Sequence, residues 1–201
     1  FGKVTMDIGT SRQLFIDNRF FESSENVKLC MNPPIQHPEI LLTGDKAWEA
    51  LGISAYNTVF REEDGRFRMW YGAMMKSGLP QEGAIRLGYA ESEDGLHWEK
   101  PVLGLIPFQG SKENNLVAPN LGGQSMQGGT IYRDERAPQA ERYKLWSKFQ
   151  PTNKQISKGI LPGLWTMYSA DGIHWEVPEG QPNPADQMCD TQNMFFWDDR
   201  L

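Results

Sequence analysis

The sequence predicts an all-β fold assembled from repeated four-stranded antiparallel sheets. An octet that begins at Ser92 returns at Ser169, a shift of 77 positions, with six of its eight residues identical. Short apolar runs lie before and after each octet, and polar turns that contain glycine separate them, as in antiparallel strands. Units that each form one cohesive sheet with an unburied face are typical of the blades of a β-propeller.

Each octet has the composition of a tight turn that ends one strand and begins the next. The first copy reads Ser92-Glu93-Asp94-Gly95-Leu96-His97-Trp98-Glu99. Ser and Asp side chains accept hydrogen bonds from nearby backbone N–H groups, and Gly adopts the positive φ that follows. The Trp ring then buries a large apolar surface at the start of the next strand. Because His97 and His174 occupy the same place in both copies, we expect them to be structural.

The chain before the first repeat is predicted to hold a hairpin and a loop. Two apolar runs flank a polar turn over 23–26, which predicts a β-hairpin over 12–32. The stretch that follows contains Pro33, Pro34 and Pro38 and is expected to be a loop, with one helical turn between 45 and 51.

Residues 52–101 are interpreted as the first repeat unit, or blade one. Strands are predicted over 57–61, 67–72 and 85–90, and an acidic turn with Gly65 separates the first two. The first octet then leads the chain into a fourth strand around Trp98.

Residues 125–178 are interpreted as the second unit, or blade two. Strands are predicted over 130–133, 143–147 and 164–169, followed by the second octet. Aligning the units pairs Val59 with Ile131 and Trp70 with Trp146.

A third unit is predicted to begin within residues 190–201. Asn193 and Met194 open an apolar run, and Asp198-Asp199-Arg200 opens the same acidic turn. Two blades and a fragment do not close a ring, so we expect a longer polypeptide in which the whole of 1–201 is one incomplete propeller domain. The hairpin over 12–32 would supply strands to the last blade and close the ring.

The composition disfavours several classes of partner. The chain has 20 Lys and Arg against 26 Asp and Glu, a net charge of −6, so nucleic acid and anionic membrane surfaces are not expected partners. No apolar run approaches the roughly 18 residues of a membrane span. Cys30 and Cys189 do not have the spacing of metal ligands, and they leave both a disulfide and its absence open.

The Ser-x-Asp-Gly-x-x-Trp turn, repeated at a long period after a strand, resembles the five-bladed β-propeller glycosidase superfamily, which contains glycoside hydrolase families 32, 43, 68 and 130. The opening run Gln13 to Arg19, with Asn32-Pro33-Pro34, is similar to the start of bacterial secreted propellers grouped loosely with it. The resemblance covers nearly the whole chain at the level of architecture. It implies a five-bladed propeller with about two and a half blades present, in a bacterial protein of the periplasm or the extracellular space.

The resemblance also implies where catalysis would occur. Glycoside hydrolysis uses two carboxylates, about 5–5.5 Å apart for retention and wider apart for inversion. In the resembled superfamily, these acids stand at the starts of the innermost strands and point into a central funnel. Blade one has Tyr56 and Asn57 there, and blade two has Gln127 and Gly128, so neither offers an acid. In the third unit Asp190 matches, and it is the expected general acid.

Other polar side chains near these strand starts are candidates for substrate binding. Tyr56, Asn57, Gln127 and Gln192 would bind sugar hydroxyls or stack on sugar rings, with a plain strand-entry role as the alternative. The second carboxylate would come from the remaining blades or from the loop with Asp45 and Glu49, whose alternative is a solvated turn. No metal site and no cofactor are expected, and a structural cation in the central channel is left open.

The implied function is that of a glycoside hydrolase-like protein that acts on an oligo- or polysaccharide. Because acids are missing at two strand starts, a non-catalytic carbohydrate-binding propeller is one alternative. A protein-interaction scaffold is another. The sugar, the linkage and the oligomeric state do not follow from the sequence.

Overall fold

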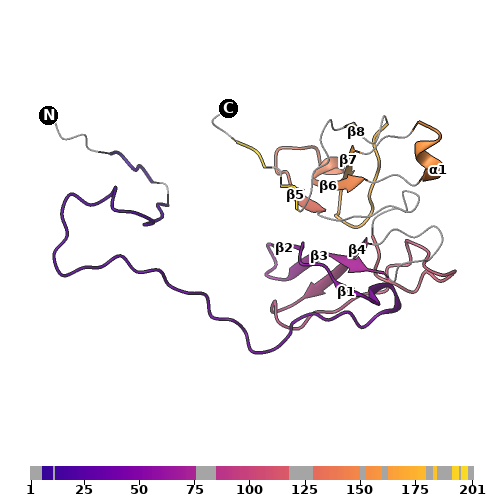
Figure 1. Cartoon of the computed structure of the whole chain (residues 1–201), viewed down its shortest axis with the longest axis horizontal. Helices are drawn as coiled ribbons and strands as arrows, with labels where there is room; N and C mark the ends of the chain where they lie inside the picture. The colour runs from indigo at the N-terminus through magenta and orange to yellow at the C-terminus, as the bar shows by residue number, and fades with distance from the viewer. Residues whose placement is uncertain are drawn as a thin grey trace. The chain divides into compact units, whose positions relative to one another are not determined.

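The computed structural model describes residues 6–10, 12–75, 85–117, 129–149, 153–159, 163–179, 183–184, 192–194 and 196–198. The chain divides into two units, Phe1–Glu39 and Ile40–Leu201. The second unit is all-β apart from single helical turns (Figure 1). In chain order its elements are η1 (Ala47–Glu49), β1 (Gly52–Ile53), β2 (Thr58–Arg61), β3 (Phe67–Met74), β4 (Ile85–Ser92), β5 (Thr130–Arg133), η2 (Gln139–Glu141), β6 (Tyr143–Phe149), α1 (Asn153–Ile156), β7 (Gly163–Ser169) and β8 (Asn183–Pro184).

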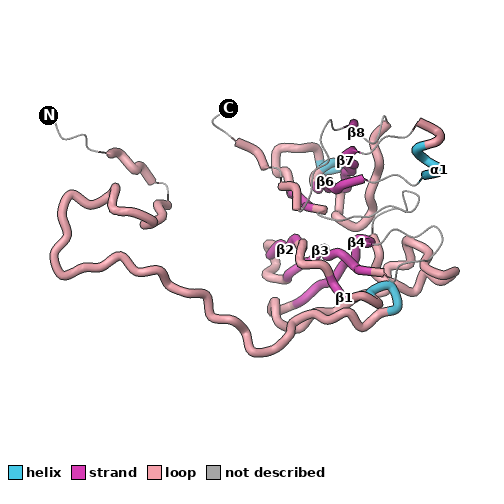
Figure 2. The backbone as a smooth tube through the Cα atoms, viewed as in Figure 1, coloured by secondary structure: helices cyan, strands magenta, loops and turns pink. Residues whose placement is uncertain are grey.

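The first unit contains no strand among its described residues, 6–10 and 12–39 (Figure 2). The hairpin predicted over 12–32 is therefore not formed in this structure, and apolar side chains such as Ile16 are 73% exposed. A two-stranded hairpin is marginally stable in water without a third strand or a covering face. Its role in closing a ring stays a prediction.

The first sheet consists of β1 to β4, all antiparallel. β1 and β2 pair with the two ends of the same edge of β3, and β4 pairs with the other edge. The edge formed by β1 and β2 is called the inner edge, and residues 54–57 interrupt it between these two strands. The three strands predicted for this unit are confirmed, although β3 and β4 each extend two residues further than expected. The predicted helical turn is the 3₁₀ turn η1.

The second sheet consists of β5 to β8 in sequential order. Thr130 lies opposite Trp146 as Thr58 lies opposite Trp70. Trp70 and Trp146 therefore hold equivalent positions in the two sheets, which confirms the alignment of the two repeats at these residues.

The outer edge of each sheet is discontinuous. Glu99 forms a bridge with Glu91, and after a loop over 100–114 the chain returns to pair Leu116 with Gly88. The second sheet has a bridge between Tyr168 and Glu176, followed by β8. The sequence predicted the fourth strand only around Trp98, because its second segment lies in a stretch without an alternating pattern.

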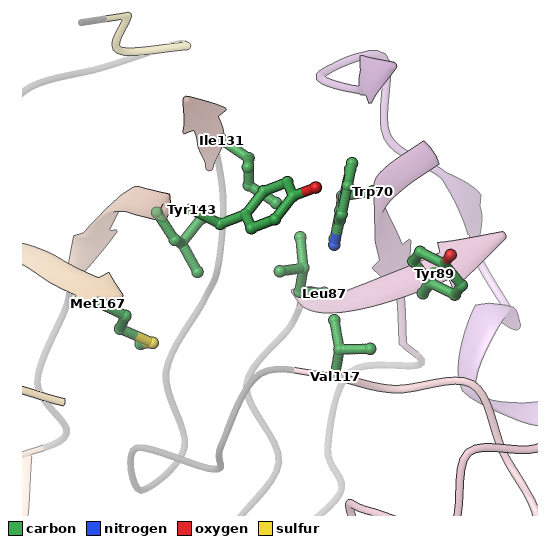
Figure 3. Close-up of a cluster of buried hydrophobic side chains, with 8 residues drawn as sticks. Trp70, Leu87, Tyr89, Val117, Ile131, Tyr143 and Met167 are labelled. Carbon is green, nitrogen blue, oxygen red and sulfur yellow. The ribbon is translucent and has the colours of Figure 1, made fainter. Parts of the chain in front are cut away.

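Two apolar clusters lie on opposite faces of the first sheet. One joins it to the second sheet and is shown in Figure 3: Trp70, Leu87 and Tyr89 face Ile131, Tyr143 and Met167. The other is covered by loops of the same unit, and it contains Met69, Tyr71, Ala73, Met75, Ala90, Phe108 and Leu116 with Trp48 and Trp98 packed against them. Both faces of the first sheet are therefore covered from within the unit.

The third unit has no strand among its described residues, 192–194 and 196–198, and its existence as a blade stays a prediction. Over the described parts of the chain, no helix has both the length and the apolarity needed to cross a membrane.

Candidate functional site

The first octet forms a closed turn through its own side chains. Ser92 Oγ accepts from the Gly95 N–H (2.8 Å), and Asp94 Oδ1 accepts from the N–H groups of Leu96 and His97 (2.8 Å each). The His97 ring nitrogen Nδ1 lies 2.7 Å from Asp94 Oδ2. The backbone and side-chain hydrogen bonds from His97 hold the pKa of the Asp94 carboxyl well below its usual range.

The second octet repeats this turn. Ser169 Oγ accepts from Gly172 (2.9 Å), and Asp171 Oδ1 accepts from Ile173 and His174 (2.8 Å each). Burial opposes ionisation of Asp171, but the hydrogen bonds from His174 and Ile173 lower its pKa to about 2. The structural role predicted for both octet histidines agrees with these contacts, since each ring binds its own Asp.

The two octets differ in the partner of their glycine carbonyl. In the first, Trp98 Nε1–H donates to Gly95 O within the octet (3.0 Å). In the second, Gly172 O accepts from Trp70 Nε1–H of the first sheet (2.7 Å). Trp175 Nε1 is buried without a hydrogen-bond partner among the described residues. The second octet has thus replaced an internal hydrogen bond with one that joins the sheets.

Arg68 reinforces the contact between the two sheets, which is called the joint. Its Nε donates to Tyr89 OH (2.8 Å), Nη1 to Tyr143 OH (3.1 Å) and Nη2 to the Asp171 carbonyl (2.5 Å). The guanidinium also lies 4.9 Å from the Trp70 ring centroid. Arg68 binds residues of both sheets, and the sequence analysis did not single it out.

A groove of about 630 Å³ lies at this end of the sheets, lined by Arg68 together with charged turn residues. Glu62 binds Arg133 across the sheets (2.8 Å), and Arg133 also binds Glu135 (2.8 Å). Because these charges already pair with one another, the groove is primarily a structural joint.

The predicted substrate site lies at the opposite end, where the inner strands begin. The Ile131 N–H donates to Thr58 Oγ1 (3.2 Å), so the starts of β2 and β5 lie side by side. Tyr56 and Asn57 directly precede β2 and lie in the interruption of the inner edge. Tyr56 and Asn57 therefore directly precede a strand start that contacts the start of β5.

Tyr56 and Asn57 differ in how their side chains are held. Tyr56 is half-buried, and its N–H donates to Ser54 Oγ (3.3 Å). Asn57 is exposed, and with its amide nitrogen turned toward the backbone it donates to the Ser54 carbonyl (3.0 Å). In that orientation the Asn57 amide nitrogen is bound to the backbone, while the side chain as a whole is exposed.

Of the other sequence candidates at strand starts, the structure describes Gln192. Gln192 is half-buried. Gln127 and Asp190 lie outside the described residues, as does Cys189, while Cys30 is exposed. Among the described candidates for substrate binding, Tyr56 and Asn57 lie together, next to Thr58, which contacts the start of β5.

Asp45 and Glu49 meet at one ammonium group. Lys100 Nζ donates to Asp45 Oδ1 and to Glu49 Oε2, both at 2.6 Å. Glu49 Oε2 also accepts from the N–H groups of Asp45 (3.1 Å) and Lys46 (3.2 Å), and Oε1 from Tyr71 OH (2.5 Å). The side chains of Lys100 and Glu49 are 7% and 0% exposed, so Glu49 has no open side toward a substrate.

Asp45 has a different environment from Glu49. Its side chain is 54% exposed, and the hydrogen bond from Lys100 lowers the pKa of its carboxyl. A Cβ on Gly44 would lie 2.8 Å from Gly52 Cα, so this loop touches the start of β1, which leads to Tyr56. Asp45 is therefore an ionised, solvent-accessible carboxylate on the loop that touches the start of β1.

The Tyr71 hydroxyl is held deep inside this network. Asn115 Nδ2 donates to Tyr71 OH (2.6 Å), and Trp48 Nε1 donates to Asn115 Oδ1 (2.8 Å). Burial, followed by the hydrogen bond to Glu49, raises the pKa of Tyr71 far above its usual range. No cluster of three or more His, Cys, Asp or Glu side chains that could hold a metal occurs in the part of the chain that the structure describes.

No protein-family model and no curated protein matches this chain. Among solved structures, it is similar to a glycosyl hydrolase from Bacteroides ovatus, with 19% identity and a TM-score of 0.40 over 67% of this chain and 33% of that one. It is also similar to the NanB sialidase from Streptococcus pneumoniae, with 16% identity and a TM-score of 0.37 over 60% of this chain and 19% of that one. The chain thus spans a third or less of these proteins. Both TM-scores are below 0.5, so the function proposed next rests on this chain's own residues.

Proposed function

We propose that this chain is part of a glycoside hydrolase-like, five-bladed propeller protein that cleaves a glycosidic bond in an oligo- or polysaccharide. The observation that supports the proposal best is the hydrogen bond between Ile131 N–H and Thr58 Oγ1, which gathers the starts of two inner strands. A site built from successive strand starts needs this convergence. The repeated octets, whose superfamily resemblance points to carbohydrate, are consistent with it.

In the proposed site, Tyr56 and Asn57 bind the sugar. The half-buried Tyr56 ring offers an apolar face for stacking and a hydroxyl for hydrogen bonding. The Asn57 amide oxygen accepts from a sugar hydroxyl, since the amide nitrogen is bound to Ser54. Gln127 and Gln192 are proposed to complete the set from the following inner strands.

The proposed chemistry assigns different roles to two aspartates. Asp190 is the general acid that protonates the leaving oxygen. Asp45 is preferred over Glu49 as the second carboxylate, because it is accessible and the Lys100 ammonium keeps it ionised. An ionised carboxylate is suited to activate water or to attack the anomeric carbon, whereas a general acid must carry a proton.

Hydrolysis assays on a broad oligosaccharide panel test the proposal. Asp190→Asn should lower kcat by roughly 10²–10⁴-fold with little change in binding, because only the proton donor is lost. Asp186→Asn, the same change four residues earlier in the chain, is the matched control and should retain activity. Tyr56→Ala should instead weaken binding.

Full turnover by the Asp190→Asn protein would refute the acid assignment. If the wild-type protein binds glycans but cleaves none of the panel, the non-catalytic binding role replaces the enzymatic one. Absence of any glycan binding would refute both.

A further inference from the structure

Residues 54–57 form a bulge on the inner edge of the first sheet. The pairing of β1 with β3 ends at Ala73, and the pairing of β2 with β3 begins at Trp70. The four residues 54–57 therefore lie across from only two residues of β3, Tyr71 and Gly72. A bulge bends its strand and re-aims the side chains that it carries, and bulges are common beside active sites. Both proposed sugar-binding residues of this sheet lie in the bulge, so its geometry determines how they are presented.

Ser54 holds both of these residues through its own atoms. Its Oγ accepts from the Tyr56 N–H (3.3 Å). Its carbonyl accepts from the Asn57 amide nitrogen (3.0 Å), which also lies 3.3 Å from the Tyr56 carbonyl when it is turned toward the backbone. Because Asn57 is exposed, packing restrains its side chain little, and the hydrogen bond to Ser54 sets its orientation.

Ser54 is itself seated on Gly72 of β3. The Ser54 N–H donates to the Gly72 carbonyl (2.8 Å). A Cβ at position 72 would lie 2.7 Å from Ser54 Cβ, closer than a real Cβ atom approaches a neighbour, and 3.0 Å from Ile85 Cγ2. A glycine inside a strand often marks such a close approach of another backbone segment. Glycine at position 72 therefore lets Ser54 lie where it bonds to Tyr56 and Asn57.

The serine and its glycine are not part of the pattern that the two repeats share. In the alignment of the repeats, Met126 stands at the sequence position of Ser54, and Lys148 stands at that of Gly72. A residue that both sheets need, such as Thr58, recurs in the second repeat. A serine and a glycine that occur together in the first repeat alone indicate a local role in the bulge.

We propose that Ser54, seated on Gly72, is the positioning residue of the sugar site, and that it holds Tyr56 and Asn57 in the orientation that binds the substrate. The inference rests on the proposed function, since it assigns a role within that site. Ser54 takes no part in the chemistry, so its replacement should raise Kd and KM and leave kcat unchanged. A residue with only a structural role would instead change the stability of the protein without changing the affinity of the folded protein.

The first test compares Ser54→Ala with the matched control Ser111→Ala. Each serine Oγ accepts from the N–H two residues later, at 3.3 Å for Ser54 and 3.1 Å for Ser111, so both variants lose the same local hydrogen bond. Binding is measured calorimetrically with tri- to hexasaccharides of xylose, arabinose, glucose, mannose and galactose. Ser54→Ala should raise Kd about three- to tenfold, and Ser111→Ala less than about twofold.

The second test separates positioning from stability. Gly72→Ala should displace Ser54 and raise Kd about tenfold or more, and it should lower the folding equilibrium constant from urea unfolding about five- to a hundredfold, because the added methyl group overpacks the contact. Adding Ser54→Gly removes the Cβ that this methyl group meets. The double variant should regain most of the folding equilibrium constant, but its Kd should stay raised because the Oγ acceptor is missing.

The geometry can also be measured without a ligand. In the unliganded protein, the two side-chain N–H protons of Asn57 should exchange with solvent at different rates, because only one of them can be directed at the Ser54 carbonyl. Gly72→Ala should remove this difference in the NMR spectrum.

Equal effects of Ser54→Ala and Ser111→Ala on Kd would overturn the inference, as would a double variant whose affinity returns with its stability. Both results leave the proposed function intact, since the unsubstituted protein still binds. If the unsubstituted protein binds no member of the panel, the proposed function fails, and the role of Ser54 in sugar binding fails with it. The exchange of the Asn57 protons then shows separately whether the bulge is held by Ser54 and Gly72.

Discussion

Replacing Gly172 by Ala should break the joint between the two sheets, whereas the same change at Gly95 should not. Both glycines have a positive φ, +76° and +77°, so each alanine carries a similar backbone penalty of about 1–2 kcal/mol. A Cβ on Gly172 would lie 2.6 Å from Trp70 Cζ2. A Cβ on Gly95 would meet the Phe67 ring at 3.5 Å, an ordinary contact. Only the alanine at position 172 has to displace a neighbouring side chain.

The displaced neighbour is costly to move. Trp70 is 1% exposed, and its indole N–H is bonded to the Gly172 carbonyl. Moving it leaves a buried donor without an acceptor, which costs about 1–3 kcal/mol. The total expected for Gly172→Ala is therefore about 2–5 kcal/mol, against about 1–2 kcal/mol for Gly95→Ala.

The assay is urea denaturation at equilibrium, followed by both Trp fluorescence and far-UV circular dichroism so that a two-state transition can be checked. The difference between the two variants isolates the contact between the sheets, since the backbone term is common to both. Equal losses of unfolding free energy at Gly172 and Gly95 would refute the close approach of the second octet to Trp70.

Two further perturbations test the network around the first sheet and the octet turns. Lys100→Met should cost about 3–5 kcal/mol of unfolding free energy, because it leaves the buried Glu49 carboxylate without its cation. Lys46→Met removes an ion pair whose partners are 39% and 54% exposed, and it should cost less than about 1 kcal/mol. Similar losses for the two variants in urea titrations would contradict the buried pair. Asp171 has a folded pKa of about 2 against 3.8 unfolded, so its stabilisation is present above pH 4 and is lost as the pH falls toward 2. Asp171→Asn should reduce the acid-induced loss by about 1 kcal/mol after allowance for its half-exposed side chain, and unchanged acid sensitivity in pH-dependent urea titrations would argue against its pairing.

The strands and the octet turns could be predicted because their causes are local. Short apolar runs between polar turns define β2 to β4, and Ser92, Asp94 and Gly95 bond within their own turn. The equivalence of Trp70 and Trp146 in the two sheets also followed from the repeat. In these places the residues that determine the conformation are neighbours in the sequence.

The joint between the sheets could not be predicted in the same way. Gly172 and Trp70 are 102 positions apart, and two octets with six of eight residues identical do not indicate that one glycine carbonyl bonds within its octet while the other bonds to the neighbouring sheet. One available signal was the recurrence of a basic residue two positions before Trp, at Arg68 and Lys144. The burial of Glu49 could not be predicted either, since its partner Lys100 lies far along the chain, beyond the first octet.

The central claim is that the starts of successive inner strands together form a carbohydrate site. The most direct measurement is an NMR titration of the ¹⁵N-labelled protein with a panel of oligosaccharides. The account predicts that chemical-shift changes cluster at residues 54–58 and 129–131. Changes centred instead on the groove around Arg68 and Asp171, or no changes with any glycan, would contradict it.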